Sequence, residues 1–199
     1  MIVKRILLAA LLSAILMFLW GFLFWGIMDF SSKLMQPLPA ELDVLAALRG
    51  SQATSGMYIY PAPPGSQDQA AREEFEAKHE EGPILQMAYR ADGGPMMPPA
   101  KFVQGLVHYF VISLLTAALV ALAGRGLPKF GQRFLVVFLV SLIATLWSNG
   151  GDMIWWFHFW GYCLGNTAYY LVSGFLMAFV VASLVNAVCA RLRLVKQVN

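Results

Sequence analysis

The sequence predicts an all-α membrane fold: a bundle of four transmembrane helices with a small α+β extracytoplasmic cap between helices 1 and 2. Three observations support this prediction. Hydrophobic residues make up 59% of the 199 residues and charged residues only 13%, against roughly 25% charged in a soluble domain. The apolar residues form four long uncharged runs, and most of the charge lies between the first two. This composition excludes a disordered chain, a basic nucleic-acid-binding domain and a disulfide scaffold.

Each apolar run is long enough to cross a membrane as a helix. About 20 residues, rising about 1.5 Å each, span roughly 30 Å of hydrocarbon. The predicted spans are 6–28, 102–124, 134–151 and 165–190, of which the third is only just long enough. Lys4 and Arg5 before the first run would also fit a secretory signal. Because the run is longer than a signal's apolar region and no cleavage site follows, we interpret it as an uncleaved anchor.

The charges divide between the two sides that the four spans define. The amino terminus, the link between the second and third spans and the basic tail 191–199 hold eight basic residues and no acidic one. The segment 29–101, with the link around Asp152, holds six basic and all eleven acidic residues. Because basic residues near helix ends stay in the cytoplasm, both termini are predicted to be cytoplasmic and the 29–101 segment to be outside.

Aromatic side chains gather at the predicted outer ends of the spans. Amphipathic rings favour the headgroup level of a membrane. The segment 152–164, between the third and fourth spans, is therefore predicted to be an aromatic link lying in the outer interface. The expected interfacial anchors are Trp20, Trp25, Trp155, Trp156 and Trp160.

The segment 29–101 has the periodicity of a small domain rather than of a flexible linker. Its leucine spacing predicts a short helix over 39–49, which opens with proline and stops before a glycine. Ser66 and Gln69 have the spacing of a capping box for a polar helix that ends at Glu81. We therefore expect an α+β cap domain over 29–101, on the outer side of the membrane.

Two short strands are predicted in the cap, at 57–60 and 84–90. The helix between them permits a crossover with parallel pairing. Two strands bury too little to be stable alone, so the cap is expected to lean on the membrane helices or on a partner protein. The partner-facing candidates are Leu85, Met87 and Tyr89 on one face, and Tyr58 and Tyr60 on another.

Small residues recur every four positions in the fourth span, at Gly174, Ala178 and Ala182. Such stripes let helices approach closely inside a bilayer. We expect them to pack the bundle internally, with dimerisation as the alternative.

Few residues offer chemistry. His108 in the second span and His158 on the outer link have the side chains of haem or metal ligands. The alternative is that His108 hydrogen-bonds a neighbouring helix and that His158 is an interfacial aromatic. No catalytic motif is present, and no metal site, cofactor or catalytic residue is expected.

Three short motifs resemble a group of bacterial four-span membrane proteins, most of which are called hypothetical. These motifs are Trp20-Gly21, Ser55-Gly56-x-Tyr58-x-Tyr60-Pro61 and Glu81-Gly82-Pro83. The resemblance implies a multi-pass protein of the inner membrane with a periplasmic first loop, and it implies no activity. The loop layout is also similar to claudins and to quinone-linked disulfide oxidoreductases. The second comparison fails on chemistry, because the outer loop has no cysteine.

These observations predict a non-enzymatic inner-membrane scaffold or accessory protein that recognises a partner through its periplasmic cap. The spans contain no charged residue at mid-membrane depth, which argues against a pump. Two alternatives stay open: a protein that handles lipids or small molecules for transport, and a haem- or quinone-associated redox subunit. The expected partners are the lipid bilayer and a membrane or periplasmic protein. No nucleic acid is expected to bind, and the sequence predicts no particular oligomeric state.

Overall fold

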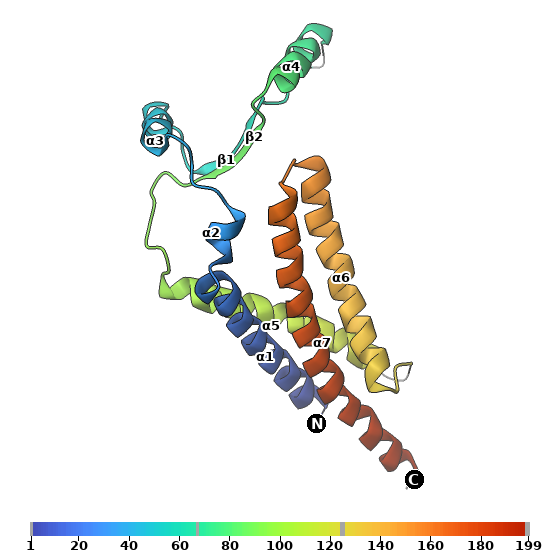
Figure 1. The fold of residues 1–199 in the computed structure, drawn as a ribbon. Coiled ribbons are helices and arrows are strands. Elements are labelled where there is room, and N and C mark those ends of the chain that lie inside the picture. Colours follow the sequence, from blue (N-terminus) through green and yellow to red (C-terminus); the bar gives the residue numbers. More distant parts are fainter. Residues whose placement is uncertain (1, 67, 124–125, 198–199) are drawn as a thin grey trace. The chain divides into compact units, whose positions relative to one another are not determined.

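The computed structural model describes residues 2–66, 68–123 and 126–197, with side chains described up to residue 185. The chain divides into two units (Figure 1). The helical unit comprises Met1–Gln36 and Met97–Asn199, and the cap comprises Pro37–Met96. The basic side chains predicted for the tail 191–199 lie outside the described side chains.

Four helices of the described chain are long and apolar enough to cross a membrane. The first consists of α1 and a π-helical turn, η1; the fourth is the apolar part, Trp160–Val185, of the longer helix α7. A short helix, α2, follows η1. The bounds are α1 Ile2–Gly21, η1 Phe22–Ile27, α2 Phe30–Leu34, α5 Pro99–Leu122, α6 Phe130–Trp155 and α7 Trp160–Gln197.

Helix α6 extends beyond the predicted third span at both ends. It has 26 residues, and only 156–159 separate it from α7. Its first turn includes Arg133, which is fully buried. The guanidinium donates hydrogen bonds to the carbonyls of Leu127 and Pro128, the second at 3.1 Å. Arg133 therefore belongs to the helix and holds the preceding link against it.

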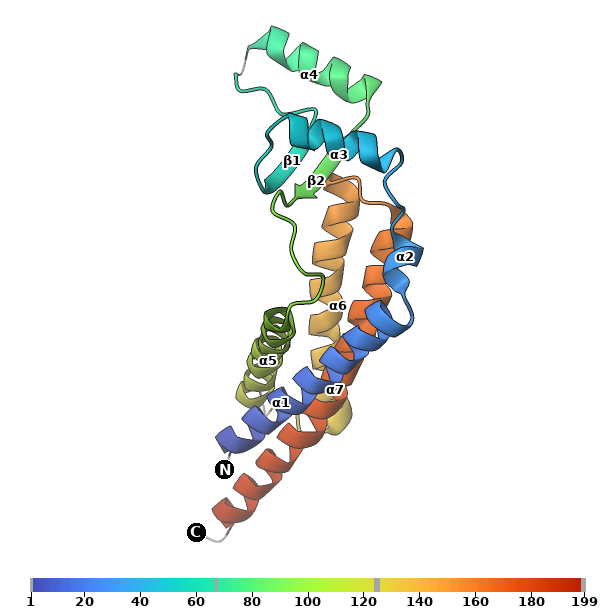
Figure 2. The same cartoon turned by 90° about the vertical axis from the view of Figure 1, so that its left-hand side faces the viewer.

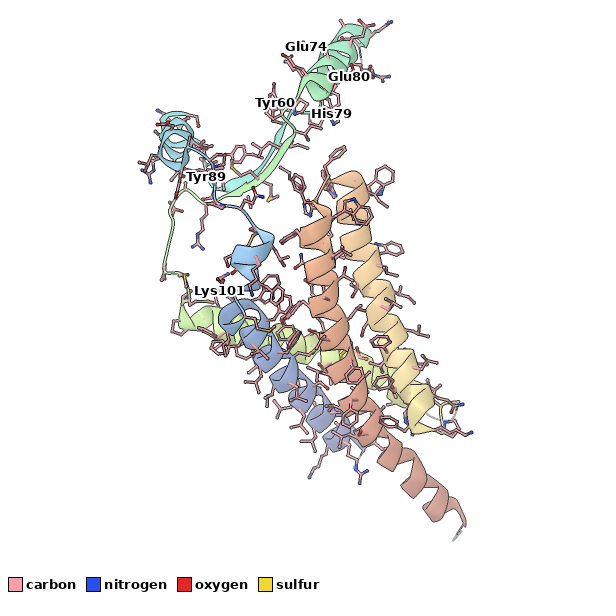
Figure 3. The ribbon with its side chains drawn as sticks, in the orientation of Figure 1. Tyr60, Glu74, His79, Glu80, Tyr89 and Lys101 are labelled. Carbon is pink, nitrogen blue, oxygen red and sulfur yellow. The ribbon has the colours of Figure 1, made fainter. Side chains whose placement is uncertain are left out.

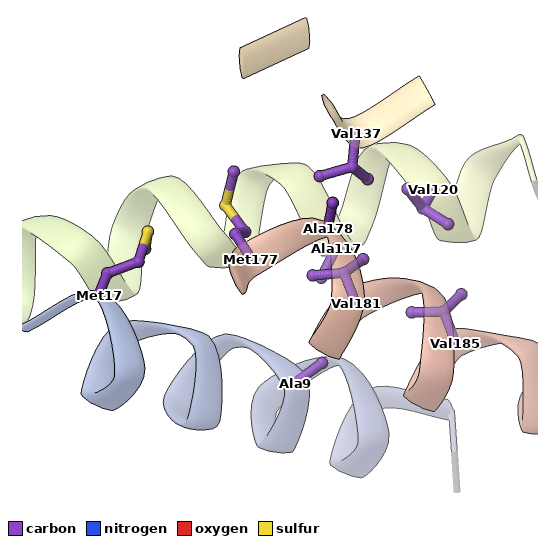
Figure 4. Close-up of a cluster of buried hydrophobic side chains, with 9 residues drawn as sticks. All are labelled: Ala9, Met17, Ala117, Val120, Val137, Met177, Ala178, Val181 and Val185. Atoms are coloured by element: carbon purple, nitrogen blue, oxygen red, sulfur yellow. The ribbon is translucent and has the colours of Figure 1, made fainter. Parts of the chain in front are cut away.

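The core of the helical unit lies between all four span helices (Figure 4). Helix α7 packs against α1, α5 and α6, and is therefore the central helix of the unit. Helices α1 and α5 also pack on each other. The buried cluster consists of Ala9, Met17, Ala117, Val120, Val137, Met177, Ala178, Val181 and Val185. Helix α1 begins and α7 ends at the same end of this unit, as four alternating spans require (Figure 2).

The cap contains two helices and a two-stranded antiparallel sheet. Its elements are α3 Glu41–Gly50, β1 Gly56–Tyr60, α4 Gln69–Glu81 and β2 Leu85–Tyr89. Parallel pairing, which the order strand–helix–strand permits, is wrong for this chain. A crossover helix needs an apolar stripe to pack on a sheet face. Helix α4 is polar and has no buried residue, so the chain simply returns after it.

The start of α4 differs from the predicted capping box. The side chain of Asp68 accepts a hydrogen bond from the Ala71 amide at 2.8 Å, which makes Asp68 the N-cap. Ser66 donates a hydrogen bond to the Asp68 carboxylate instead of capping the helix itself. Ser66 therefore contacts the N-cap residue Asp68 and makes no N-cap hydrogen bond to α4 itself.

Among the described residues of the cap, Pro61 alone is buried. Helices α3 and α4 have no buried residue, and every residue of β1 is exposed. The cap therefore has secondary structure and turns but no hydrophobic core of its own.

Candidate functional site

The two strands of the cap form a ribbon in which Tyr58 stands opposite Met87, and Tyr60 opposite Leu85. Directly opposite residues of an antiparallel pair point to the same face. Gly56 stands opposite Tyr89, so the Tyr89 side chain belongs to that face too. The expectation of two separate faces is therefore wrong. We call this single surface the tyrosine face: Tyr58, Tyr60, Leu85, Met87 and Tyr89.

The tyrosine face is open. Tyr58, Tyr60 and Leu85 are 36%, 42% and 46% exposed. The Tyr58 ring meets the edge of the Tyr89 ring at 6.4 Å between centroids, and its hydroxyl donates a 2.7 Å hydrogen bond to the Thr54 carbonyl. Figure 3 shows Tyr60 and Tyr89 at opposite ends of the ribbon. Met87 and Tyr89 are half-buried, so the face is held in place while most of it stays exposed.

The opposite face of the ribbon is also uncovered. Met57 is 66% and Ile59 is 43% exposed. In the described part of the cap, neither α3 nor α4 packs extensively on either strand. Both strands are edge strands, and neither contains a charged residue or a proline within its bounds. Natural proteins usually blunt such edges with charge, proline or a covering element.

Negative charge surrounds this apolar ribbon. The cap holds nine acidic and four basic residues, a net charge of −5. Six of the acidic residues belong to α4 or are its N-cap residue, and we call them the acidic end: Asp68, Glu73, Glu74, Glu76, Glu80 and Glu81. Glu80 and Glu81 lie in the last turn, where the helix dipole is negative and carboxylates are disfavoured. Figure 3 shows Glu80 near the end of the ribbon that holds Tyr60.

Local contacts favour the ionised form of two of these carboxylates, those of Glu74 and Asp68. Lys78 forms a 2.5 Å ion pair with Glu74, which lowers the pKa of Glu74 and raises that of Lys78. The hydrogen bond from Ser66, followed by that from the Ala71 amide, lowers the pKa of Asp68. Both contacts therefore stabilise negative charge on Asp68 and Glu74.

A second group of polar contacts lies inside the helical unit. The indole nitrogen of Trp20 donates to the Tyr169 carbonyl at 3.1 Å, and Ser173 donates to the same oxygen at 2.9 Å. The Tyr169 hydroxyl hydrogen-bonds that of Tyr109, which joins α5 to α7. Gly21 leaves room for this pair, because a Cβ there would lie 3.0 Å from the Tyr169 hydroxyl. We call Trp20, Tyr109, Tyr169 and Ser173 the tyrosine lock.

The sequence offered a partial signal for the tyrosine lock. Tyr109 and Tyr169 interrupt otherwise apolar helices, and Trp20-Gly21 was noted as a motif without a role. Trp20 and Trp25 both contact the Tyr169 ring, with centroids 6.4 Å and 5.5 Å away. Trp20 therefore has an internal partner that its prediction as an interfacial anchor did not include. Trp155, Trp156 and Trp160 are exposed at and beside the α6–α7 link.

The small residues of α7 lie at close helix contacts. A Cβ at Gly174 would lie 2.5 Å from the Cβ of Ser141 on α6. Ala178 and Ala182 are fully buried. Any larger side chain at these positions must displace the neighbouring helix.

The two histidines lie beside aromatic rings. His108 is exposed on α5 next to Tyr109, and the His158 ring meets Tyr162 at 6.0 Å. In the part of the chain that the structure describes, no three His, Cys, Asp or Glu side chains group as a metal site.

Comparisons with protein-family models, curated proteins and solved structures found no match.

Proposed function

We propose that this chain is a non-enzymatic, multi-pass protein of the bacterial inner membrane that recognises a protein partner through a periplasmic cap. Its helical unit anchors the chain, and both termini are cytoplasmic. The single observation that supports partner recognition is the tyrosine face, an apolar surface left uncovered in a unit without a core. Exposed apolar patches of this kind mark interaction sites.

The charge distribution supports the orientation. The cap carries −5, while the sequence segments on the other side of the spans carry eight basic residues and no acidic one. Because basic residues in short segments near the ends of spans stay in the cytoplasm, those segments are expected there and the cap on the opposite side. The cap is also too polar to enter the hydrocarbon, so lipid tails are not the cover for its ribbon.

Reporter fusions test the orientation. Alkaline phosphatase inserted at Gly65 should be active, because it folds only outside the cytoplasm, and a fluorescent protein after Asn199 should fluoresce. The reverse pattern would place the cap in the cytoplasm and contradict the proposal.

Site-specific photo-crosslinking tests recognition. A benzophenone amino acid in place of Tyr58 or Tyr60 should give discrete crosslinks to another protein in living cells. Ala70, which is exposed on α4, is the matched control position and should give none. If the tyrosine face crosslinks only to lipid or to this chain's own helical unit, the cap is not a recognition site.

A further inference from the structure

The ribbon indicates not only that a partner binds but also what form it takes, on the basis of the function proposed above. We propose that the tyrosine face and an open edge of the ribbon bind an extended, cationic segment of a protein, which adds to the ribbon as a third strand.

The edges support strand addition. Each strand has a neighbour on one side only, so the backbone N–H and C=O groups of its outer side have no partner in the sheet. Each strand runs for five residues without charge or proline, which are the usual devices against pairing. Three strands are also the least number expected to be stable alone. A third strand would therefore pair an open edge and raise the sheet to the smallest size expected to be stable.

The faces define the side chains of this segment. Successive residues of a strand point to opposite faces of a sheet. Alternate residues of the added strand would therefore lie beside Tyr58 and Tyr60 or beside Leu85 and Met87, depending on the edge. Aromatic and β-branched residues pair best with such neighbours.

The negative charge of the cap determines which kind of partner it attracts. A second copy would bring two caps of −5 together, and an anionic membrane surface would repel one such cap. A segment with lysine or arginine is attracted instead. Only residues 82–84 separate the end of α4 at Glu81 from the strand end Leu85, so the acidic end adjoins one end of the ribbon. The basic residues of the bound segment should therefore lie at that end.

Mapping the crosslinks from Tyr58 and Tyr60 by mass spectrometry tests the inference in the full-length protein. The crosslinked peptide should come from another protein, contain lysine or arginine and alternate apolar with polar residues. The double change Glu80→Lys with Glu81→Lys should lower the crosslink yield about tenfold, because it places like charges together. Glu41→Lys with Asp43→Lys on α3, an equal change of charge away from the acidic end, should lower it far less.

A synthetic copy of the mapped segment tests backbone pairing. It should bind the purified protein in zwitterionic nanodiscs, and alternate N-methyl groups along one edge should abolish binding because they remove the donors of a strand.

Each other outcome overturns the inference. A crosslink to a second copy, to an acidic or helical segment, or one unaffected by the Glu80 and Glu81 changes leaves recognition standing and refutes this mode. Binding that survives N-methylation refutes strand addition in the same way. Crosslinks to lipid alone, or none at all, refute the proposed function itself.

Discussion

The helical unit and the cap differ in the burial of their apolar side chains. In the helical unit, residues such as Ala9, Val120 and Val181 are fully buried where helices meet. In the cap, Met57, Tyr58, Tyr60 and Leu85 stay exposed along the ribbon, and Pro61 is the one buried residue among those described. The comparison shows that the helical unit contains the contacts that hold it together, whereas the cap has its local structure without a core.

Exposure also has a different meaning in the two regions. The helical unit exposes Leu115, Leu139 and Trp147 on the apolar stretches of α5 and α6, where lipid tails are the natural cover. The ribbon exposes Tyr60 and Leu85 next to a run of glutamates, where lipid tails are excluded. A similar exposed fraction therefore fits a lipid cover in the helical unit and, under the function proposed above, a protein partner at the cap.

A larger side chain at Gly174 should produce the largest loss of stability, because this position lies in the closely packed helical unit. Gly174→Leu must separate α7 from α6, since even a Cβ would lie 2.5 Å from Ser141 Cβ. Overpacking of this kind costs about 1–3 kcal/mol. Ala178→Leu should act in the same direction, because Ala178 is fully buried. Thermal unfolding in detergent measures both.

Gly161→Leu on the same helix is the matched control, because nothing lies within 4 Å of a Cβ there. It should leave the melting temperature nearly unchanged. If Gly174→Leu is equally harmless, α6 and α7 do not pack as described and the contrast between the two regions fails.

Removing the hydroxyls of the tyrosine lock should produce a smaller effect in the same region. Tyr109→Phe and Tyr169→Phe each break one hydrogen bond without changing the ring packing. Interhelical hydrogen bonds in membranes average about 0.6 kcal/mol in double-mutant cycles. The double variant should therefore be no less stable than the single ones. Strictly additive losses would show that the two hydroxyls do not interact.

The number and approximate position of the spans could be predicted because crossing a bilayer needs a continuous apolar run, which is a local property of the sequence. The ends of α6 could not be predicted in this way. Arg133 and Asp152 are charged, and a charged residue normally marks the end of an apolar run. Arg133 lies in the first turn, and its two terminal nitrogens donate hydrogen bonds to the carbonyls of Leu127 and Pro128 in the link before the helix. The Asp152 carbonyl accepts the amides of Trp156 and His158 and closes the last turn.

The cap was harder to predict because its organisation depends on contacts between distant residues. Alternation over 84–90 predicts Leu85, Met87 and Tyr89 on one face, and the short run before Pro61 predicts a strand with Tyr58 and Tyr60. That all five share one face follows from the antiparallel register, which neither pattern contains. The tyrosine lock is similar. Tyr109 and Tyr169 are polar interruptions in two helices, and only the packing of α5 and α7 brings their hydroxyls together.

The smallest predicted effect concerns the N-cap of α4, because it is local and fully solvated. Asp68→Ala should increase hydrogen exchange at the Ala71 amide, which loses its acceptor, whereas Asp68→Asn keeps an oxygen there and should retain the protection. Because the folded pKa of Asp68 is lowered, its contribution is complete above the ordinary carboxyl pKa of about 3.9.

That contribution is lost as the pH falls through the lowered value. Protection of Ala71 in the wild type should therefore decline only in strong acid, while Asp68→Asn should show no such step. Exchange should stay unchanged in the helical unit, since its packing has no part in this contact. An acid-dependent step of equal size in Asp68→Asn would assign the titration to the neighbouring Glu74–Lys78 pair instead. Spread of the loss into α6 or α7 would show that the two regions are coupled, and would end the distinction drawn between them.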